Sequence, residues 1–160
     1  GQYLYEETKN SPSNFCIGGA GYPEKHFEAM NLKSDLKHLK EKVDAGMEFI
    51  VTQLFYDNKK FFEFEKKCRE IGITVPIIPG LKPITNLRHL TFIPKFFNTN
   101  FPEEFSNELE KCKTNDEVKK VGVEWSTMQS QELVKAGVPV LHFYTMGKGA
   151  SVKNIASKIF

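Results

Sequence analysis

Short apolar segments alternate with amphipathic segments along most of this chain, and the alternation limits the folds that it can adopt. The apolar segments, each predicted to be a strand, lie at residues 15–20, 48–55, 73–81 and 138–146. The intervening segments carry apolar residues three or four positions apart, which is typical of helices with one buried face. Apolar strands that alternate with such helices predict an α/β fold of parallel strands covered by helices.

Capping residues help to show where the predicted helices begin and end. These helices lie at residues 32–45, at about 58–71, after Thr85, after Phe101, at 115–136 and at 151–160. Asp57 or Asn58 is expected to cap the second helix, and Thr85 the third. Gly46, Gly72 and Gly137 stand where helices commonly end. Pro76 and Pro79 should shorten the third strand, because proline lacks the N–H that a sheet needs.

Two architectures are compatible with this order of elements. One is a doubly wound open sheet, and the other is a part of a (β/α)₈ barrel. A complete barrel needs eight strands and roughly 250 residues, so four βα units would be half of one. No Gly-x-Gly-x-x-Gly follows a predicted strand, so the usual dinucleotide-binding fingerprint is absent. The pattern alone leaves both architectures open.

Composition and charge exclude several classes of function for this chain. The formal net charge is +2 with Lys and Glu interleaved, whereas a nucleic-acid partner would favour a basic stripe. The sequence has no run of eighteen apolar residues, so it predicts no membrane span. Cys16, Cys68 and Cys112 are odd in number and far apart, which predicts buried structural thiols in a reducing cytoplasm and neither disulfides nor a zinc site. No group of His residues has metal-ligand spacing.

Ligands of parallel α/β folds bind at the carboxyl ends of the strands. That rule selects four segments that mix polar, aromatic and turn-forming residues: residues 20–26, 52–57, 79–83 and 142–148. Taken singly, their side chains have ordinary structural interpretations, such as an amide that bonds a neighbouring loop or a solvated histidine. The segments contain no Ser-His-Asp order and no phosphate-binding loop, so position alone does not define a reaction.

Five segments together resemble the methylenetetrahydrofolate reductase family. They are Ala-Gly-Tyr-Pro-Glu-Lys-His-Phe-Glu-Ala (20–29), the helix with Asp35 and Leu-Lys-Glu-Lys-Val-Asp-Ala-Gly (39–46), Phe-Ile-Val-Thr-Gln-Leu-Phe-Tyr-Asp (49–57), Ile-Ile-Pro-Gly-Leu-Lys-Pro-Ile (77–84) and Leu-His-Phe-Tyr-Thr-Met (141–146). Each segment alone is moderate evidence, but five in the same order with matching spacing are strong evidence. The resemblance covers residues 14–160.

The resemblance implies a fold and an activity. The family fold is a TIM (β/α)₈ barrel, so residues 14–160 are expected to supply its last four βα units as the C-terminal half of one domain, after a loop at residues 1–13. The implied reaction is the reduction of 5,10-methylenetetrahydrofolate to 5-methyltetrahydrofolate for methionine supply. FAD would take the hydride from NADH or NADPH and pass it to the folate. Such an enzyme would be cytoplasmic.

The resemblance also assigns roles to single residues. The positions that correspond to flavin contacts are Tyr22, His26, Ala29, Asp35, His38 and Lys42. Gln53 corresponds to the residue that contacts the pterin and, in turn, the nicotinamide, and an amide offers both donors and an acceptor for that purpose. His89 and Lys148 stand at folate-proximal positions where relatives often carry Gln and Arg. Glu41 near the flavin phosphates would be unfavourable.

Several parts of the family's site have no counterpart in this sequence. These are the general-acid Glu, the Asp that pairs with the pterin and an Arg-Gly-Asp flavin segment. We therefore expect a fragment of a longer enzyme, which pairs with its N-terminal half or forms a homo-oligomer. Two alternatives remain: a non-catalytic half-barrel module that pairs with a second chain, and a different barrel or open-sheet enzyme without flavin.

Overall fold

The predicted alternation of strands and helices is present in the computed structural model, which describes residues 15–160. The strands are β1 (Gly18–Gly21), β2 (Phe49–Thr52), β3 (Ile77–Ile78), β4 (Gly80–Leu81) and β5 (His142–Phe143). The helices are α2 (Leu32–Asp44), α3 (Asn58–Glu70), α4 (Arg88–Phe97), α5 (Glu103–Glu110), α6 (Asn115–Lys135) and α7 (Ala150–Ala156). The expectation of an N-terminal loop at residues 1–13 lies outside the described residues.

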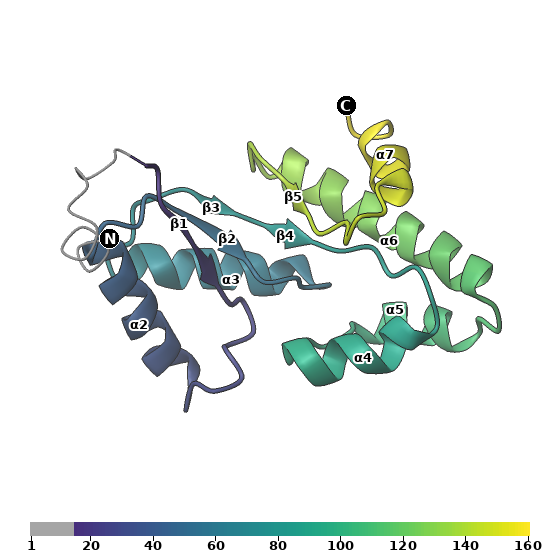
Figure 1. Cartoon of the computed structure of the whole chain (residues 1–160), viewed down its shortest axis with the longest axis horizontal. Helices are drawn as coiled ribbons and strands as arrows, with labels where there is room; N and C mark the ends of the chain where they lie inside the picture. The colour runs from purple at the N-terminus through teal and green to yellow at the C-terminus, as the bar shows by residue number, and fades with distance from the viewer. Residues whose placement is uncertain (1–14) are drawn as a thin grey trace, which may run out of the picture.

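All strand pairs in the described part of the chain are parallel, as the apolar pattern predicts. β1, β2 and β3 form one sheet in that order, and β4 pairs with β5 in a second sheet. Gly21 is opposite Thr52 at the end of the first pair, and Leu81 is opposite Phe143 at the end of the last. The carboxyl ends of neighbouring strands therefore lie side by side, which Figure 1 shows for β1 and β2.

The strands are shorter than the sequence predicts. The single strand expected at residues 73–81 is two pairs of residues separated by Pro79, because proline has no N–H to donate to a ladder. The strand expected at 138–146 pairs only at His142–Phe143. The first strand was predicted at 15–20 but begins at Gly18, and Phe15 and Ile17 are exposed.

Side-chain caps explain where three of the six described helices begin. The Asp57 carboxylate accepts from the Lys59 amide at the start of α3 (2.9 Å), and Thr114 forms a capping box with Glu117 at the start of α6. The Asn31 side chain caps α2, which we did not predict. The predicted Thr85 cap is wrong, because α4 begins at Arg88, three residues after Thr85.

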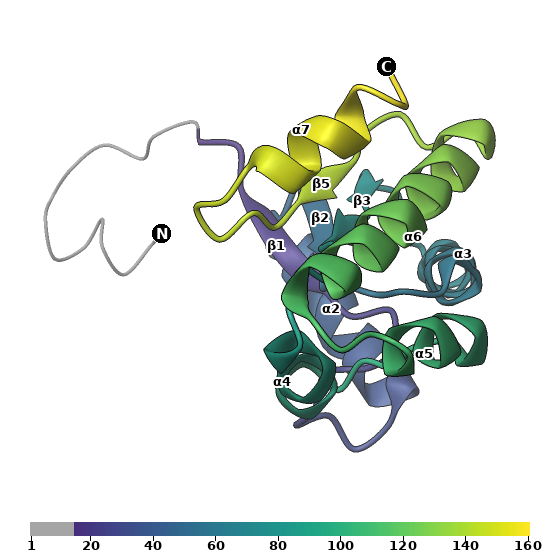
Figure 2. The ribbon, with the colours of Figure 1, turned by 90° about the vertical axis from the view of Figure 1, so that its right-hand side faces the viewer.

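Two hydrophobic clusters hold these elements together. The first packs α2 and α3 against β2 and β3, and its most buried rings are Phe55, Phe61 and Phe64. The second lies among α4, α5 and α6 around Tyr56 and Phe105. Figures 1 and 2 show α2 and α3 along one side of β1 and β2, whereas α6, which contacts α3, α5 and α7, lies nearer β5.

The face of the first sheet that points away from α2 and α3 is partly exposed, whereas a sheet covered by helices on both sides would have two buried faces. In β2, Ile50 and Thr52 are fully buried while Phe49 and Val51 are half-buried. Ala20 in β1 is exposed. Since successive strand residues alternate between faces, only the face toward α2 and α3 is closed within residues 15–160.

The cysteines follow the prediction only in part. All three are free, and Cys68 is fully buried, which raises the pKa of its thiol to about 12. Cys112 is half-buried. Cys16 is exposed, because it precedes β1 and lies outside both hydrophobic clusters. The expectation of three buried thiols is therefore wrong for Cys16. Within residues 15–160, no helix is long and apolar enough to cross a membrane.

Candidate functional site

The ends of β1 and β2 bring Tyr22 and Gln53 to adjacent positions. Backbone pairing continues one residue past the strands, where the Gln53 amide donates to the Gly21 carbonyl (2.8 Å). Tyr22 follows Gly21 directly, and both Tyr22 and Gln53 are half-buried. The structure therefore brings a predicted flavin contact and the predicted pterin contact to the same edge of the sheet.

The orientation of the Gln53 side chain is set by its own backbone. Its Oε1 accepts from the Leu54 amide (3.0 Å), which is the next N–H along the chain. With the carbonyl oxygen occupied in this way, the two N–H donors of the amide remain for a ligand. A side chain arranged like this suits an acceptor such as a ring carbonyl or ring nitrogen.

Thr52 joins the two sheets at the break made by Pro79. Its Oγ1 accepts from the buried Gly80 amide (2.9 Å), and its carbonyl accepts from the Tyr144 hydroxyl (2.9 Å). A Cβ on Gly80 would lie 2.0 Å from the Thr52 carbonyl oxygen, so only glycine permits this approach. Tyr144, which follows β5, thereby reaches the end of β2.

The loop between β1 and α2 forms a compact aromatic and polar group. The Tyr22 and His26 rings meet edge to face with centroids 4.5 Å apart, and the His26 amide donates to Asp35 Oδ2 (2.8 Å). His26 Nδ1 accepts from the Glu28 amide (3.3 Å), which leaves Nε2 to carry the ring proton and donate. Ala29 closes a turn by donating to the His26 carbonyl (3.1 Å).

Burial and charge keep the two tyrosines of this region protonated. Burial, followed by the negative charges of Asp35 and Glu28, raises the pKa of Tyr22 above its ordinary value of 10.0. Burial, followed by Tyr22 itself, raises the pKa of Tyr144 above the same value. Both phenols are therefore neutral at physiological pH and can donate a hydrogen bond.

One face of α2 presents the remaining predicted flavin contacts. Asp35, His38 and Lys42 are spaced by three and four residues, which places them along one side of the helix. Lys42 Nζ reaches the Ala20 carbonyl of β1 (3.5 Å), and both His38 and Lys42 are exposed. The unfavourable charge expected from Glu41 is reduced, since Glu41 pairs with Lys37 (3.8 Å).

His89 and Lys148 are less closely connected to this region. Both ring nitrogens of His89 have local partners: Nδ1 accepts from the Thr85 amide (3.2 Å), and Nε2 lies 3.0 Å from Asn86 Nδ2. Burial and then the charge of Lys82 lower the pKa of His89 below 6.5. Lys148 lies exposed in a turn after β5, and its side chain has no hydrogen bond or ion pair within residues 15–160.

The structure adds two residues that we did not single out, Lys82 and Glu24, and it gives a structural role to a third, Tyr144. Lys82 follows β4, is half-buried, and has its pKa lowered by that burial. Tyr144 bridges to Thr52, and Glu24 bonds to Asn100 as described below. All three lie in the strand-end segments, so position alone could have found them, but the partners of Tyr144 and Glu24 are distant in sequence.

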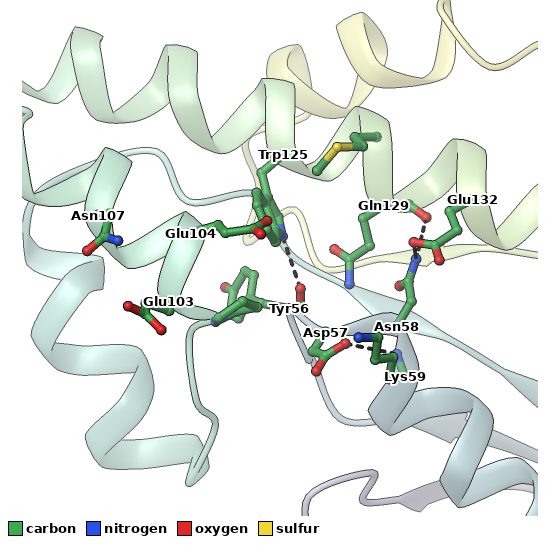
Figure 3. A pocket seen from close by; sticks show the side chains of 12 residues that line it. Tyr56, Asp57, Asn58, Lys59, Glu103, Glu104, Asn107, Trp125, Gln129 and Glu132 are labelled. Atoms are coloured by element: carbon green, nitrogen blue, oxygen red, sulfur yellow. Dashed lines mark hydrogen bonds between the residues drawn. The ribbon is translucent and has the colours of Figure 1, made fainter.

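A cavity of about 600 Å³ lies between α3, α5 and α6, and Tyr56 and Asp57 at the end of the segment 52–57 are among the residues that line it. Figure 3 shows Asp57, Glu103, Glu104 and Glu132 around it, together with the Trp125 indole, which donates to the Tyr56 carbonyl (3.0 Å). None of the predicted site residues lines it. Asp57, Glu103 and Glu104 stand in or next to the first turns of α3 and α5, where carboxylates stabilise a helix.

These features define an α/β protein whose candidate site gathers polar and aromatic side chains where parallel strands end. Among the described residues, no group of three His, Cys, Asp or Glu side chains could hold a metal ion. The family model described as methylenetetrahydrofolate reductase matches residues 3–159. The chain therefore belongs to the methylenetetrahydrofolate reductase family, as the five segments predicted.

Curated relatives with this name come from distant organisms. A probable methylenetetrahydrofolate reductase (NADPH) of Caenorhabditis elegans is 40% identical over 160 residues, which cover 99% of this chain and 24% of the relative. Methylenetetrahydrofolate reductase (NADH) 1 of Arabidopsis thaliana is 42% identical, with 88% and 26% covered. The 5,10-methylenetetrahydrofolate reductase of Salmonella typhimurium is 35% identical, with 85% and 46% covered. The chain thus spans between a quarter and a half of these relatives.

A solved structure has a similar fold. It is an uncharacterised protein of Clostridium thermocellum whose description says that it binds two copies of 5-methyl-5,6,7,8-tetrahydrofolic acid. The two align with a TM-score of 0.58 at 19% identity, over 91% of this chain and 53% of that one. At this identity the likeness supports the α/β fold with parallel strands and nothing finer.

Proposed function

We propose that the protein containing this chain reduces 5,10-methylenetetrahydrofolate to 5-methyltetrahydrofolate with NADH or NADPH, using FAD. Membership of the family supports the reaction. The observation that carries it to this chain is the juxtaposition of Gln53 with the Tyr22–His26–Asp35 group at adjacent strand ends. A cytoplasmic location is part of the same proposal.

The proposal extends to the architecture. The strands follow one another in sequence order, from β1 through β2 and the β3–β4 segment to β5, with every pair parallel. A doubly wound sheet reverses its strand order at a switch point, whereas a (β/α)₈ barrel does not. This order favours the barrel, with residues 14–160 as its last four βα units. The half-open face of β1 and β2 would then line the barrel interior.

The chemistry of the side chains fits FAD. The Tyr22 and His26 rings offer flat surfaces and a free Nε2 donor, while Lys42 and His38 suit the oxygens of a diphosphate. Asp35 can accept from a hydroxyl, although one of its oxygens already accepts from the His26 amide. When bound, FAD would carry the hydride from nicotinamide to folate. These side chains would bind and orient it.

Gln53 would hold the ring that exchanges hydride with the cofactor. Because Oε1 is occupied by the Leu54 amide, the two N–H donors would face the pterin or the nicotinamide amide in turn. On the folate side, His89 and Lys148 remain candidates, the latter as a point charge for a carboxylate. His89 would first have to release one of its local partners. The occupied Nδ1 and Nε2 therefore favour Lys148 over His89 as a direct contact.

The test uses the full-length protein and two glutamines. Gln53→Ala should keep its bound flavin but lose about 10–100-fold in the turnover of methylenetetrahydrofolate, since an amide hydrogen bond at a buried site contributes ~1–3 kcal/mol. The matched control is Gln131→Ala, because Gln131 is exposed on α6 and its side chain bonds only the Lys158 carbonyl (3.3 Å) within residues 15–160. Equal turnover in both variants would contradict the role of Gln53. Absence of flavin from the wild-type protein would contradict the proposed function.

The alternative of a non-catalytic module that pairs with a second chain has one observation in its favour. β1 pairs only with β2 in the described residues, and Phe15 and Ile17 beside it are 76% and 56% exposed. An unpaired strand edge next to exposed apolar side chains favours association. Closing of the barrel by the rest of the protein or by a second copy would cover the same edge.

A further inference from the structure

Glu24 links two loops that are far apart in the sequence. Its carboxylate follows Tyr22 and Pro23 in the loop after β1, and both of its oxygens accept from the Asn100 amide (3.3 Å each). Oε2 also accepts from Asn100 Nδ2 (3.1 Å). Asn100 lies 76 residues away, between α4 and α5. A single acidic side chain therefore connects the loop with Tyr22 and His26 to the other half of the described chain.

The Asn100 side of this contact is itself fixed. Thr99 is 2% exposed, and its Oγ1 lies 3.2 Å from both the Leu54 and the Phe97 carbonyl oxygens, which share its one hydroxyl proton. Leu54 follows Gln53, so the segment that carries the predicted pterin contact also anchors Asn100. Through these hydrogen bonds, the loop after β1 is held to the loop after β2 by a route that does not use the sheet.

Burial and the neighbouring groups act on the pKa of Glu24 in opposite directions, and the net shift is upward from its ordinary value of 4.5. Burial raises the pKa of Glu24, whereas the Asn100 hydrogen bonds and the charge of Lys60 lower it, and Asp57 opposes them. Lys60 and Asp57 both belong to the start of α3. A carboxylate that accepts from an amide and a side chain at once is a stronger acceptor than a neutral group would be.

We propose that Glu24 is a positioning residue for the flavin site. By bonding Asn100 it holds the loop after β1 in the shape in which Tyr22 and His26 meet edge to face and the His26 amide reaches Asp35. The inference rests on the proposed function, because it assigns those side chains to the flavin. Glu24 itself does not touch the cofactor.

The test reverses the direction of the side-chain hydrogen bond. Glu24→Gln places at least one N–H donor against a donor of Asn100, and Asn100→Asp places two carboxylates together. The double variant Glu24→Gln/Asn100→Asp restores complementarity, because the new amide donates to the new carboxylate and still accepts from the residue-100 amide. The control is Glu63→Gln, an exposed position of α3 without a hydrogen bond or ion pair in residues 15–160.

Each variant is made in the full-length protein and measured in two ways. The dissociation constant of FAD should rise about 3–30-fold in the single variants, most in Asn100→Asp, and return to within about threefold in the double variant. Hydrogen exchange in the flavin-free protein should speed up at the hydrogen-bonded amides of Lys25, His26 and Ala29 in the single variants only. At saturating FAD, kcat should equal that of the wild type, as expected of a residue outside the reaction.

The outcomes separate the two proposals. Unchanged flavin affinity in Asn100→Asp, or a double variant as weak as the single ones, would overturn the positioning role while leaving the reductase intact. A reduced kcat at saturating FAD would overturn it as well, because Glu24 would then act in the reaction. A wild-type protein that binds no FAD would overturn both proposals.

Discussion

Thr52→Val tests whether one hydroxyl bridges the two sheets. Valine has nearly the shape of threonine and keeps its branched Cβ, so the substitution removes little except the hydroxyl. Thr52 is fully buried, and its Oγ1 is the acceptor for the buried Gly80 amide (2.9 Å). The variant leaves that N–H without a partner, and an unpaired buried donor costs about 1–3 kcal/mol.

The measurement is urea-induced unfolding of wild type and variant. The midpoint should fall without a change in slope, and the melting temperature should drop by about 2–12 °C for a domain of this size. Thr91→Val is the matched control, because Thr91 is exposed on α4 and, among the described residues, its hydroxyl makes only a long contact with the Arg88 carbonyl (3.4 Å). Loss of stability no greater than in the control would refute the bridging role.

Two further substitutions test the packing of α6 and the environment of His89. Gly122→Ala should destabilise the protein by about 1–2 kcal/mol, because the new Cβ would lie 2.0 Å from the Ile84 carbonyl oxygen and the clash exceeds the ~1 kcal/mol gain in helix propensity. In the control Gly149→Ala, no other described residue would come within 4 Å of the new Cβ, so the free energy of unfolding should change by less than about 0.5 kcal/mol. Equal changes in the two variants would contradict the close packing at Gly122. His89→Gln should flatten the pH dependence of stability: burial and Lys82 lower the pKa of His89 below 6.5, so wild-type stability falls as pH drops from 6.5 through the folded pKa. A variant with the same slope over that range would show that His89 is not the titrating group.

Local sequence patterns were sufficient for most of the helices and for the parallel arrangement. Leu36 and Leu39 lie on the buried side of α2 as their spacing predicts, and Asp57 caps α3. Strand lengths were overestimated because apolarity reports burial and not pairing: Ile73 is fully buried but lies outside the ladder. Thr85 failed as a cap because neighbouring Asn86 accepts from the His89 amide instead (3.1 Å).

The candidate site also has one part that local sequence patterns predicted and one part that they did not. The contact between Tyr22 and His26 is local, and the proximity of Gln53 to Gly21 follows once parallel register is assumed. The bonds from Tyr144 to Thr52 and from Asn100 to Glu24 join residues 92 and 76 positions apart. Loop residues of this kind carry no periodic pattern, so nothing in the sequence marks them as a pair. The flavin and folate roles come from family resemblance and stay predictions.

These long-range bonds share a physical reason. The ladder between β2 and its neighbour stops at Ile78, and β4 pairs with β5 in a separate sheet, so backbone pairing alone does not fix the end of β2 relative to the ends of β4 and β5. Thr52, Tyr144 and Asn100 supply the connections that the ladder lacks. Side-chain bonds of this type open at lower cost than a buried ladder. The geometry of the site should therefore respond to polar substitutions at these positions before the global fold does, and flavin affinity should fall while the melting temperature changes little in Asn100→Asp.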